Sequence, residues 1–311
     1  PPTLRRQRQM CIRDSFWMNQ AFLIGVMWCM RRWFAPSLLT LTFIAATLSP
    51  IYDNAKMGQA NLMVLLIAVA ALWKRSGAAL SVAAMAKMSP ALYLAWWAAQ
   101  RRYRPVLAAM AGAVLLSLIA LPLVELPVQM KFYREILPGF SSGQYHGLTV
   151  PITLPANHSI PDLYNQLWPG ETNQKLSAVG QRASSLTALG LLAGLTVAAR
   201  HRRDPIGQAS IAGAFTSLLL VTPVYTYEHH LVMLLLPAAA LGAAIEAGRV
   251  PRLWLPFIGL SYFVVAWPLY WLRGLQDMVP AAHWLLQESK FIGIVALGLF
   301  CIAVALRSPR D

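Results

Sequence analysis

The sequence predicts an all-α, polytopic transmembrane protein, because apolar residues are abundant and form long runs. Hydrophobic residues make up 57% of the 311 residues, and charged residues only 12%. A helix crosses the hydrocarbon core of a bilayer with about 20 mostly apolar residues. Most of the runs are apolar on every side, unlike the amphipathic helices of soluble proteins. The candidate spans are about 16–30, 34–49, 60–73, 105–124, 180–199, 206–222, 229–247, 253–272 and 290–306.

The segment 77–99 is predicted to form a short helical hairpin rather than a single span. Lys87 lies near its middle and Pro90 follows closely. A proline inside a helix removes a backbone hydrogen bond and breaks or kinks the helix. A hairpin also returns the chain to the side of the membrane from which it came, and this return places every basic cluster of the short connections on one side.

These basic clusters predict the orientation in the membrane. They are Arg31/Arg32, Lys74/Arg75, Arg101/Arg102/Arg104, Arg200/Arg202/Arg203, Arg249/Arg252 and Arg307/Arg310. By the positive-inside rule their side is the cytoplasm, and the C-terminus lies there. We therefore expect a multi-pass protein of the cell (plasma or inner) membrane, in contact with membrane lipids. The net charge of +14 is then a topology signal. No nucleic-acid partner is expected, because that would need a basic face on a soluble module.

The first fifteen residues differ sharply from the rest of the chain. The stretch PPTLRRQRQMCIRDS begins without Met, resembles translated sequencing-adapter read-through, and gives way to apolar sequence at Phe16. The alternative is a basic arm next to the membrane. We predict that 1–15 is non-native and that 16–311 is a single transmembrane helical domain without its original N-terminus.

One long connection, about 125–179, is predicted on the non-cytoplasmic side. It is rich in Pro, Gly and Asn, and we expect it to be structureless. A structureless connection of this length is usually functional.

Four polar clusters interrupt the apolar runs, and all four fall on the predicted non-cytoplasmic side. They are 53–61, Lys87, 157–166 and 228–230. Polar residues without a common role would scatter over both faces. The arrangement therefore predicts one polar site that faces outward.

Lys87 is the most informative of these residues. A lysine inside an apolar membrane segment costs about 3 kcal/mol unless its ammonium reaches water or a partner. Its neighbours Met85, Ala86 and Met88 offer no counter-charge. We predict a cation that faces an outer cavity and binds a phosphate; the alternative is a lysine that reaches the interface or is paired internally.

The other polar candidates allow two interpretations each. Gln59 and Asn61 could hydrogen-bond a ligand hydroxyl or cap a helix. Glu228, His229 and His230 are consecutive residues. On a helix the side chains of adjacent histidines point about 100° apart, whereas a metal site favours ligands that are three or four residues apart. The functional interpretation of these three residues is contact with a phosphate or acid–base chemistry, and the alternative is a purely structural role. We predict neither a metal ion nor a cofactor.

Asn157 and Ser159 belong to the long connection and sit among other hydrogen-bonding residues. Asp162, Tyr164 and Asn165 follow them closely. This concentration of polar groups predicts a lid over the site.

Several motifs, in this order, resemble glycosyltransferase family 87 over about 34–247. They are GQAN at 58–61, AKMSPAL at 86–92 followed by RRYR at 101–104, Tyr133 with Leu137 and Pro138, the Asn157-x-Ser159 pair, and TPVYTYEHHLVMLLLP at 222–237. The resemblance implies a mannosyltransferase with the GT-C membrane fold that depends on polyprenyl-phosphate mannose.

The resemblance also implies a mechanism and partners. The donor would be a polyprenyl-phosphate-linked sugar and the acceptor a lipid or glycan, with inversion at the anomeric carbon. Positive groups at the leaving phosphate would stabilise the transition state more than the ground state. By position, the donor phosphate would be bound by Lys87 and by His229 or His230. The sugar or the acceptor would be bound by Gln59, Asn61, Asn157, Ser159 and Glu228.

One departure concerns the general base. The resemblance implies a catalytic carboxylate in the first outer loop, and we expect this sequence to start beyond that loop. Asp53 lies in a later loop, so the base is not assigned to it, and the chain as written is expected to be inactive as a transferase.

Two other functions remain as alternatives. A membrane transporter would place polar groups near the midplane and show related halves, and neither is visible in the sequence. An envelope polysaccharide polymerase or ligase handles similar lipid-linked phosphates and would differ in using a lipid-linked oligosaccharide.

Overall fold

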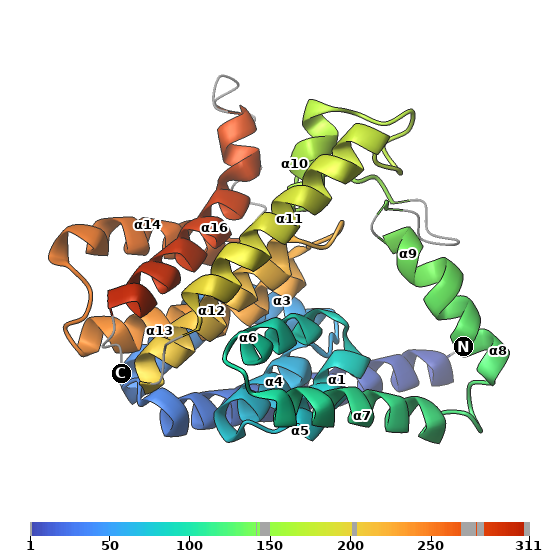
Figure 1. Ribbon diagram of the computed structural model, residues 1–311, viewed down its shortest axis with the longest axis horizontal. Coiled ribbons are helices and arrows are strands. Elements are labelled where there is room, and N and C mark those ends of the chain that lie inside the picture. The colour runs from blue at the N-terminus through green and yellow to red at the C-terminus, as the bar shows by residue number, and fades with distance from the viewer. Residues whose placement is uncertain are drawn as a thin grey trace.

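The computed structural model describes residues 2–140, 142–143, 150–200, 204–268, 278 and 283–307, with the side chains of 2–13 and 283 left out. Within these ranges every regular element is a helix and no strand occurs, which confirms the predicted all-α class. Figure 1 shows the helices of the first third of the chain lying together beneath those of the last third.

The N-terminal part of the described chain consists of seven α-helices. They are α1 (Pro2–Phe34), α2 (Leu38–Thr47), α3 (Pro50–Lys56), α4 (Asn61–Lys74), α5 (Gly77–Ala86), α6 (Tyr93–Ala99) and α7 (Tyr103–Ile119). α4 packs against α1 and α5, and α5 packs against α7. The close approach of α5 and α7 depends on Gly77, where an added Cβ would lie 2.1 Å from the carbonyl oxygen of Pro105.

The C-terminal helices include α12 (Pro205–Val221). The others are α11 (Ala178–Ala198), the 3₁₀ helix η3 (Glu228–Leu234), α13 (Leu235–Glu246), η4 (Arg252–Trp254), α14 (Leu255–Ala266) and α16 (His283–Arg307). α12 is buried at every position from 207 to 221. It packs against α13 and α16, and α16 also packs against α14. An apolar helix buried on all sides marks the centre of this bundle.

Two of the described helical segments are long and apolar enough to cross a membrane, Glu228–Glu246 and Trp284–Arg307. α3 and α4, bent by 120° at a short break, would form a third span if taken together. All nine predicted runs are helical, but several are shorter than expected. The end of the predicted run 253–272 lies outside the described residues.

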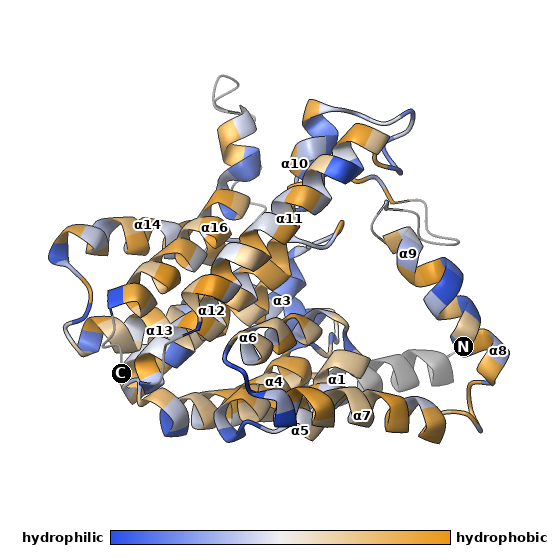
Figure 2. Ribbon diagram, viewed as in Figure 1, coloured by the Kyte–Doolittle hydropathy of each residue, from blue (hydrophilic) through white to orange (hydrophobic). Residues whose placement is uncertain are grey.

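Figure 2 shows hydrophobic residues along α7 and hydrophilic residues in the connection after α10 (Ile160–Leu167). The chain is thus a helical membrane protein.

The predicted hairpin at 77–99 is confirmed. α5 ends at Ala86, and Lys87 follows with extended backbone angles (φ −154°, ψ 121°). A 3₁₀ turn, η1 (Ser89–Leu92), then leads into α6. Pro90 stands in the first turn of η1, where a missing backbone N–H does no harm. The break therefore falls at Lys87.

The prediction that 125–179 is structureless is wrong. It contains α8 (Leu126–Lys131), a π-helical turn η2 (Phe132–Ile136), α9 (Leu137–Phe140) and α10. Pro127 and Pro161 stand in the first turns of α8 and α10, so these prolines begin helices instead of preventing them. Residues 141 and 144–149 of this connection lie outside the described ranges. α1 runs from Pro2 without a break through the stretch 1–15.

Candidate functional site

Lys87 lies at the break of the hairpin and is half-buried. Its Nζ donates a hydrogen bond to Asn61 Oδ1 at 2.6 Å. Among the described residues it forms no ion pair with a carboxylate. The ammonium is therefore held by a neutral amide, and its positive charge is not compensated by direct contact.

Asn61 orients Lys87 through a cluster of buried asparagines, which we call the amide cluster (Asn19, Asn54 and Asn61). Asn61 Nδ2 donates to Asn54 Oδ1 and to the carbonyl oxygen of His229, both at 3.0 Å. Asn54 Nδ2 donates to Asn19 Oδ1 at 2.7 Å. The three residues are at most 4% exposed. Both N–H groups of Asn61 are thus engaged, and its oxygen faces Lys87.

This arrangement bears on the predicted roles of Gln59 and Asn61. Asn61 is the first residue of α4, and no side chain caps that helix, so the capping interpretation is wrong. The backbone oxygen of Gln59 accepts from Asn54 Nδ2 at 3.2 Å. Gly58 has a positive φ of 63°, which glycine adopts without steric cost, and it permits the sharp turn between α3 and α4. Contact of Gln59 or Asn61 with a sugar stays a prediction.

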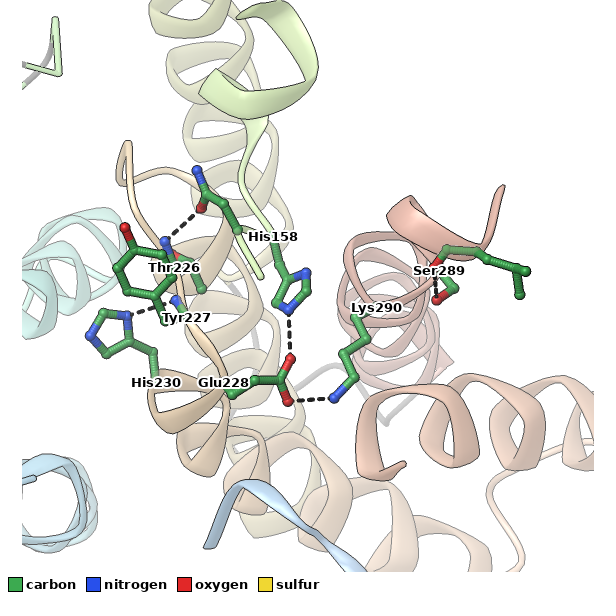
Figure 3. A network of polar contacts seen from close by, with 9 residues as sticks. His158, Thr226, Tyr227, Glu228, His230, Ser289 and Lys290 are labelled. Atoms are coloured by element: carbon green, nitrogen blue, oxygen red, sulfur yellow. Dashed lines mark hydrogen bonds and ion pairs between the residues drawn. The ribbon is translucent and has the colours of Figure 1, made fainter. Parts of the chain in front are cut away.

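A second group, the ionic cluster, comprises His158, Glu228 and Lys290. Glu228 Oε1 lies 2.8 Å from His158 Nε2, and Glu228 Oε2 accepts from Lys290 Nζ at 2.5 Å. Figure 3 shows the carboxylate between the two partners. His158 and Lys290 are fully buried, and the Glu228 side chain is 13% exposed. The carboxylate of Glu228 is therefore occupied on both oxygens.

The two histidines of η3 differ in their surroundings. His230 Nδ1 accepts a hydrogen bond from the backbone N–H of Tyr227 at 3.2 Å. An imidazole that accepts at Nδ1 carries its proton at Nε2. Figure 3 shows the His230 ring on the side of η3 away from Glu228. The rings of His229 and His230 are 4.3 Å apart, and the charge of Lys87 acts on both. His230 thus offers an N–H donor near Lys87.

No metal centre is evident in the part of the chain that the structure describes. There, no three His, Cys, Asp or Glu side chains come together as metal ligands. In η3, His230 Nδ1 accepts from the backbone of Tyr227, and the two oxygens of Glu228 contact His158 and Lys290.

Asn157 and Ser159 fasten the long connection to the segment that precedes η3. Asn157 Nδ2 donates to the carbonyl oxygens of Ile152 and Val224 at 2.9 and 2.8 Å, and its Oδ1 accepts from the N–H of Thr226 at 2.8 Å. Ser159 Oγ donates to Val224 O at 3.0 Å. Both residues are at most 1% exposed. Their structural role is thus to hold the chain just before Glu228, and a direct sugar contact stays a prediction.

Asp162 of α10 is fully buried next to Glu288 of α16. Burial and the Glu288 charge raise the pKa of Asp162 to about 8, although Thr153 and Gln166 partly counteract the shift. Gln166 Nε2 donates to Glu288 Oε1 at 2.8 Å. A neutral, protonated Asp162 at pH 7 follows, because a buried carboxylate without a cation is unstable. The hydrogen bond between Gln166 and Glu288 ties α10 to α16.

A cavity of about 310 Å³ opens beside the break at Lys87. Its walls are mostly apolar and include several hydroxyl groups, and they come from the hairpin, α9, α10, α11 and the segment before η3. The lining residues are Met88, Ser89, Leu92, Phe140, Pro161, Ser184, Ser185, Ala188, Thr222, Pro223 and Val224. Its volume is at the lower end of the range for small-molecule sites.

Three of the four predicted polar clusters therefore meet directly, since Lys87 contacts Asn61, and Asn61 contacts His229. The fourth, 157–166, joins through the bond between His158 and Glu228. Lys290 and His158 are not among the predicted site residues, although His158 lies within the predicted cluster 157–166. A lysine at the edge of the apolar run 290–306 was a signal of the same kind as Lys87. Neither Lys87 nor His230 is among the residues that line the cavity beside the break. An uncompensated ammonium together with an N–H donor can bind an anion such as a phosphate.

The comparisons with known proteins identify the family of the chain. The sequence model of glycosyltransferase family 87 matches residues 15–223, which include the amide cluster, Lys87 and the long connection. Glu228, His229, His230 and Lys290 lie beyond the matched region. No curated protein and no solved structure matches the chain. Because the matched region covers more than half of the sequence, the chain belongs to glycosyltransferase family 87.

Proposed function

We propose that this glycosyltransferase moves a mannose-type sugar from a polyprenyl phosphate to a lipid or glycan acceptor on the non-cytoplasmic face of the cell membrane, with inversion. Family membership supports sugar transfer. The outward face is supported by the basic connections, which the positive-inside rule places in the cytoplasm. The lipid phosphate is supported by the chemistry around Lys87.

The observation that carries this proposal is the uncompensated ammonium of Lys87, which is held by Asn61. Asn61 also contacts the backbone of His229, the residue next to His230. When the bond between the anomeric carbon and the phosphate oxygen breaks, negative charge grows on the leaving phosphate. A cation and an N–H donor placed at that oxygen stabilise the transition state more than the ground state. These two groups therefore support the proposal that the leaving group is a lipid phosphate.

The roles follow from the contacts. Lys87 and His230 bind the donor phosphate, and Asn61 orients Lys87. Asn157 and Ser159 hold the segment that leads to His230. The acceptor hydroxyl attacks the anomeric carbon from the face opposite to the phosphate and loses its proton to a base. We assign no residue to this base, since Glu228 is paired with both His158 and Lys290.

The family match bears on one of the two alternative functions, the transporter, more directly than on the other, the envelope polymerase or ligase. Membership of a glycosyltransferase family favours transfer of a sugar over transport. An envelope polymerase or ligase differs from the proposed enzyme in its donor, which is a lipid-linked oligosaccharide. Comparison of donors therefore distinguishes the two.

The test is a comparison of ligand affinities for the purified protein in detergent. We expect polyprenyl-phosphate mannose with a short prenyl chain to bind more tightly than the free prenol and than a polyprenyl-diphosphate oligosaccharide. Lys87→Ala should remove the preference for the phosphate, and Lys56→Ala, at an exposed lysine of α3, should retain it. Equal affinity for the phosphate and the prenol would contradict the proposal. A preference for the oligosaccharide would favour the polymerase or ligase.

A further inference from the structure

A cavity of about 770 Å³ lies where α1 meets α2. It is formed by the last turns of α1, the turn that follows and the start of α2. Its volume lies within the range for small-molecule sites. It shares no residue with the cavity beside the hairpin break. The lining residues are Ile24, Met27, Trp28, Arg31, Arg32, Ala35, Leu38 and Leu41.

The wall that α1 contributes changes from apolar to basic along the helix. Residues 24, 27, 28, 31 and 32 follow the spacing of three and four that places side chains on one face of a helix. Ile24 is 68% exposed and Trp28 is 55% exposed, so the described chain leaves the apolar part of this face largely uncovered. The face ends in Arg31 and Arg32, in the last turn of α1. One end of the cavity therefore suits an apolar chain, and the other end suits an anion.

The turn after α1 positions α2 as a second wall of the cavity. Ala35 has a positive φ of 55°, a left-handed conformation that is uncommon for a residue with a side chain. Arg31 Nη1 donates to the carbonyl oxygen of Pro36 at 2.8 Å and so fixes its guanidinium group at this turn. Leu38, which is 62% exposed, adds apolar surface. The backbone of the turn thus sets the shape of the cavity.

The two guanidinium groups keep their positive charge available. Neither forms an ion pair with a carboxylate in the part of the chain that the structure describes. The charge of Arg31 acts on Glu246, but the Glu246 carboxylate accepts hydrogen bonds from hydroxyl groups at the start of α2. The Cζ of Arg32 lies 5.7 Å from the centroid of the Trp28 ring. This cation–π contact orients the guanidinium group without cancelling its charge.

A third cation lies near the same aromatic side chains. The Trp28 ring packs edge-to-face on Trp73, with 5.7 Å between the centroids. The Nζ of Lys74 lies 3.8 Å from the centroid of the Trp73 ring. Tryptophan is enriched where a membrane meets water, and lysine and arginine are enriched on the cytoplasmic side. The change from apolar to basic in the cavity therefore coincides with the predicted cytoplasmic surface of the membrane.

A ligand that fills this cavity needs an apolar chain and an anionic headgroup. Anionic phospholipids of the cytoplasmic leaflet have this form and are attracted by basic residues next to a membrane span. A guanidinium group can bind a phosphate with two N–H groups at once. We infer that the cavity binds an anionic phospholipid of the cytoplasmic leaflet, with its phosphate at Arg31 and Arg32 and an acyl chain along Ile24.

This lipid site is distinct from the proposed donor site. Asn19 of the amide cluster lies on α1, twelve positions before Arg31, which corresponds to about 18 Å along the helix axis. The inference therefore concerns a bilayer lipid and does not depend on the sugar donor.

The test measures lipid binding to the purified full chain in detergent by native mass spectrometry. We expect dioleoylphosphatidylglycerol to bind at least about tenfold more tightly than dioleoylphosphatidylcholine, which has the same chains and no net charge. Arg31→Gln/Arg32→Gln should remove this preference. The matched control is Arg101→Gln/Arg104→Gln, which removes two exposed arginines of another basic connection and should keep the preference. Equal losses in both double variants would overturn the inference, because they would show attraction by net charge alone.

Ile24→Trp tests the apolar part of the cavity and keeps the inference testable if the arginine variant does not fold. The indole occupies the space proposed for the acyl chain and leaves every cation in place. We expect affinity for phosphatidylglycerol to fall at least about tenfold. Wild-type affinity in the folded variant would overturn the inference. Displacement of the lipid by glycerol 3-phosphate, which has a phosphate and no chains, would also overturn it.

A final measurement separates the lipid site from the donor site. Farnesyl phosphate serves as a short prenyl phosphate, and farnesol serves as its uncharged control. Arg31→Gln/Arg32→Gln should prefer farnesyl phosphate over farnesol to the same degree as the wild type. A loss of that preference would place the prenyl phosphate in this cavity and overturn the assignment to a phospholipid.

Discussion

The Nζ of Lys87 lies 2.6 Å from Asn61 Oδ1, and this hydrogen bond joins the hairpin break to the start of α4. Asn61 uses its two N–H groups on Asn54 and on the carbonyl of His229, so its amide orientation is fixed. A neutral acceptor holds the lysine without cancelling its charge. The residue type at position 61 therefore determines how strongly Lys87 attracts an anion.

Asn61→Asp tests this relationship with an almost unchanged side-chain shape. The new carboxylate would pair with Lys87 and neutralise it, and we expect affinity for farnesyl phosphate to fall at least about tenfold. Ligand titration of the detergent-solubilised protein measures the change. Wild-type affinity in the folded variant would show that Lys87 does not bind the phosphate.

The tautomer of His230 gives a second prediction. His230 Nδ1 accepts from Tyr227, which leaves Nε2–H as the donor to the phosphate. His230→Gln carries an amide N–H near the Nε2 position and should retain affinity within about threefold, whereas His230→Asn keeps only the acceptor near Nδ1 and should lose about tenfold. Titration with farnesyl phosphate distinguishes them. The reverse order of affinities would place the donor at Nδ1.

Asp162 predicts a pH dependence of stability. Its pKa of about 8 in the folded protein exceeds the ordinary value of 3.8, so between these pH values the folded state binds more protons than the unfolded state. Stability should therefore fall as pH rises from about 4 to about 8, by up to about 1.4 kcal/mol per pH unit.

Thermal unfolding at pH 5.5 and pH 8 measures this dependence. Asp162→Asn mimics the protonated carboxyl and should flatten the dependence and be more stable than the wild type at pH 8. Glu171→Gln, at an exposed carboxylate, should leave it unchanged. An unaltered slope in Asp162→Asn would show that another group titrates.

Substitution of Gly77 by alanine should create a packing defect between α5 and α7. A Cβ at this position would lie 2.1 Å from Pro105 O and 2.8 Å from the N of Ala109, so Gly77→Ala must push the helices apart. Overpacking of this kind costs about 1–3 kcal/mol. Gly190→Ala in α11, where no atom lies within 4 Å of the added Cβ, is the matched control and should be neutral or stabilising. Equal melting temperatures of the two variants would contradict the packing account.

Local sequence signals predicted the helical class and the break in the hairpin. Long apolar runs specify helices in a membrane, and Lys87 with Pro90 specifies where such a helix stops. Local signals also indicated which polar residues belong together, since Asn61, Lys87 and the 228–230 segment meet as expected. The sequence alone did not show how they meet, because each contact joins residues at least 26 positions apart.

The ionic cluster could not be predicted in the same way. Along the sequence, Lys290 is 62 positions and His158 is 70 positions away from Glu228. Only the packing of α16 and of the long connection against η3 brings these side chains together. The helices of 125–179 were missed for a local reason. Prolines commonly mark loops, whereas Pro127 and Pro161 stand in the first turns of helices.

The most direct test of the central claim compares wild-type protein and Lys87→Ala for binding of farnesyl phosphate and farnesol under identical conditions. The account predicts that the wild type prefers the phosphate by at least about tenfold, and that Lys87→Ala binds both ligands equally while its melting temperature remains near the wild-type value. An undiminished preference for the phosphate in Lys87→Ala would show that the anion is bound elsewhere and would contradict the proposed role of Lys87.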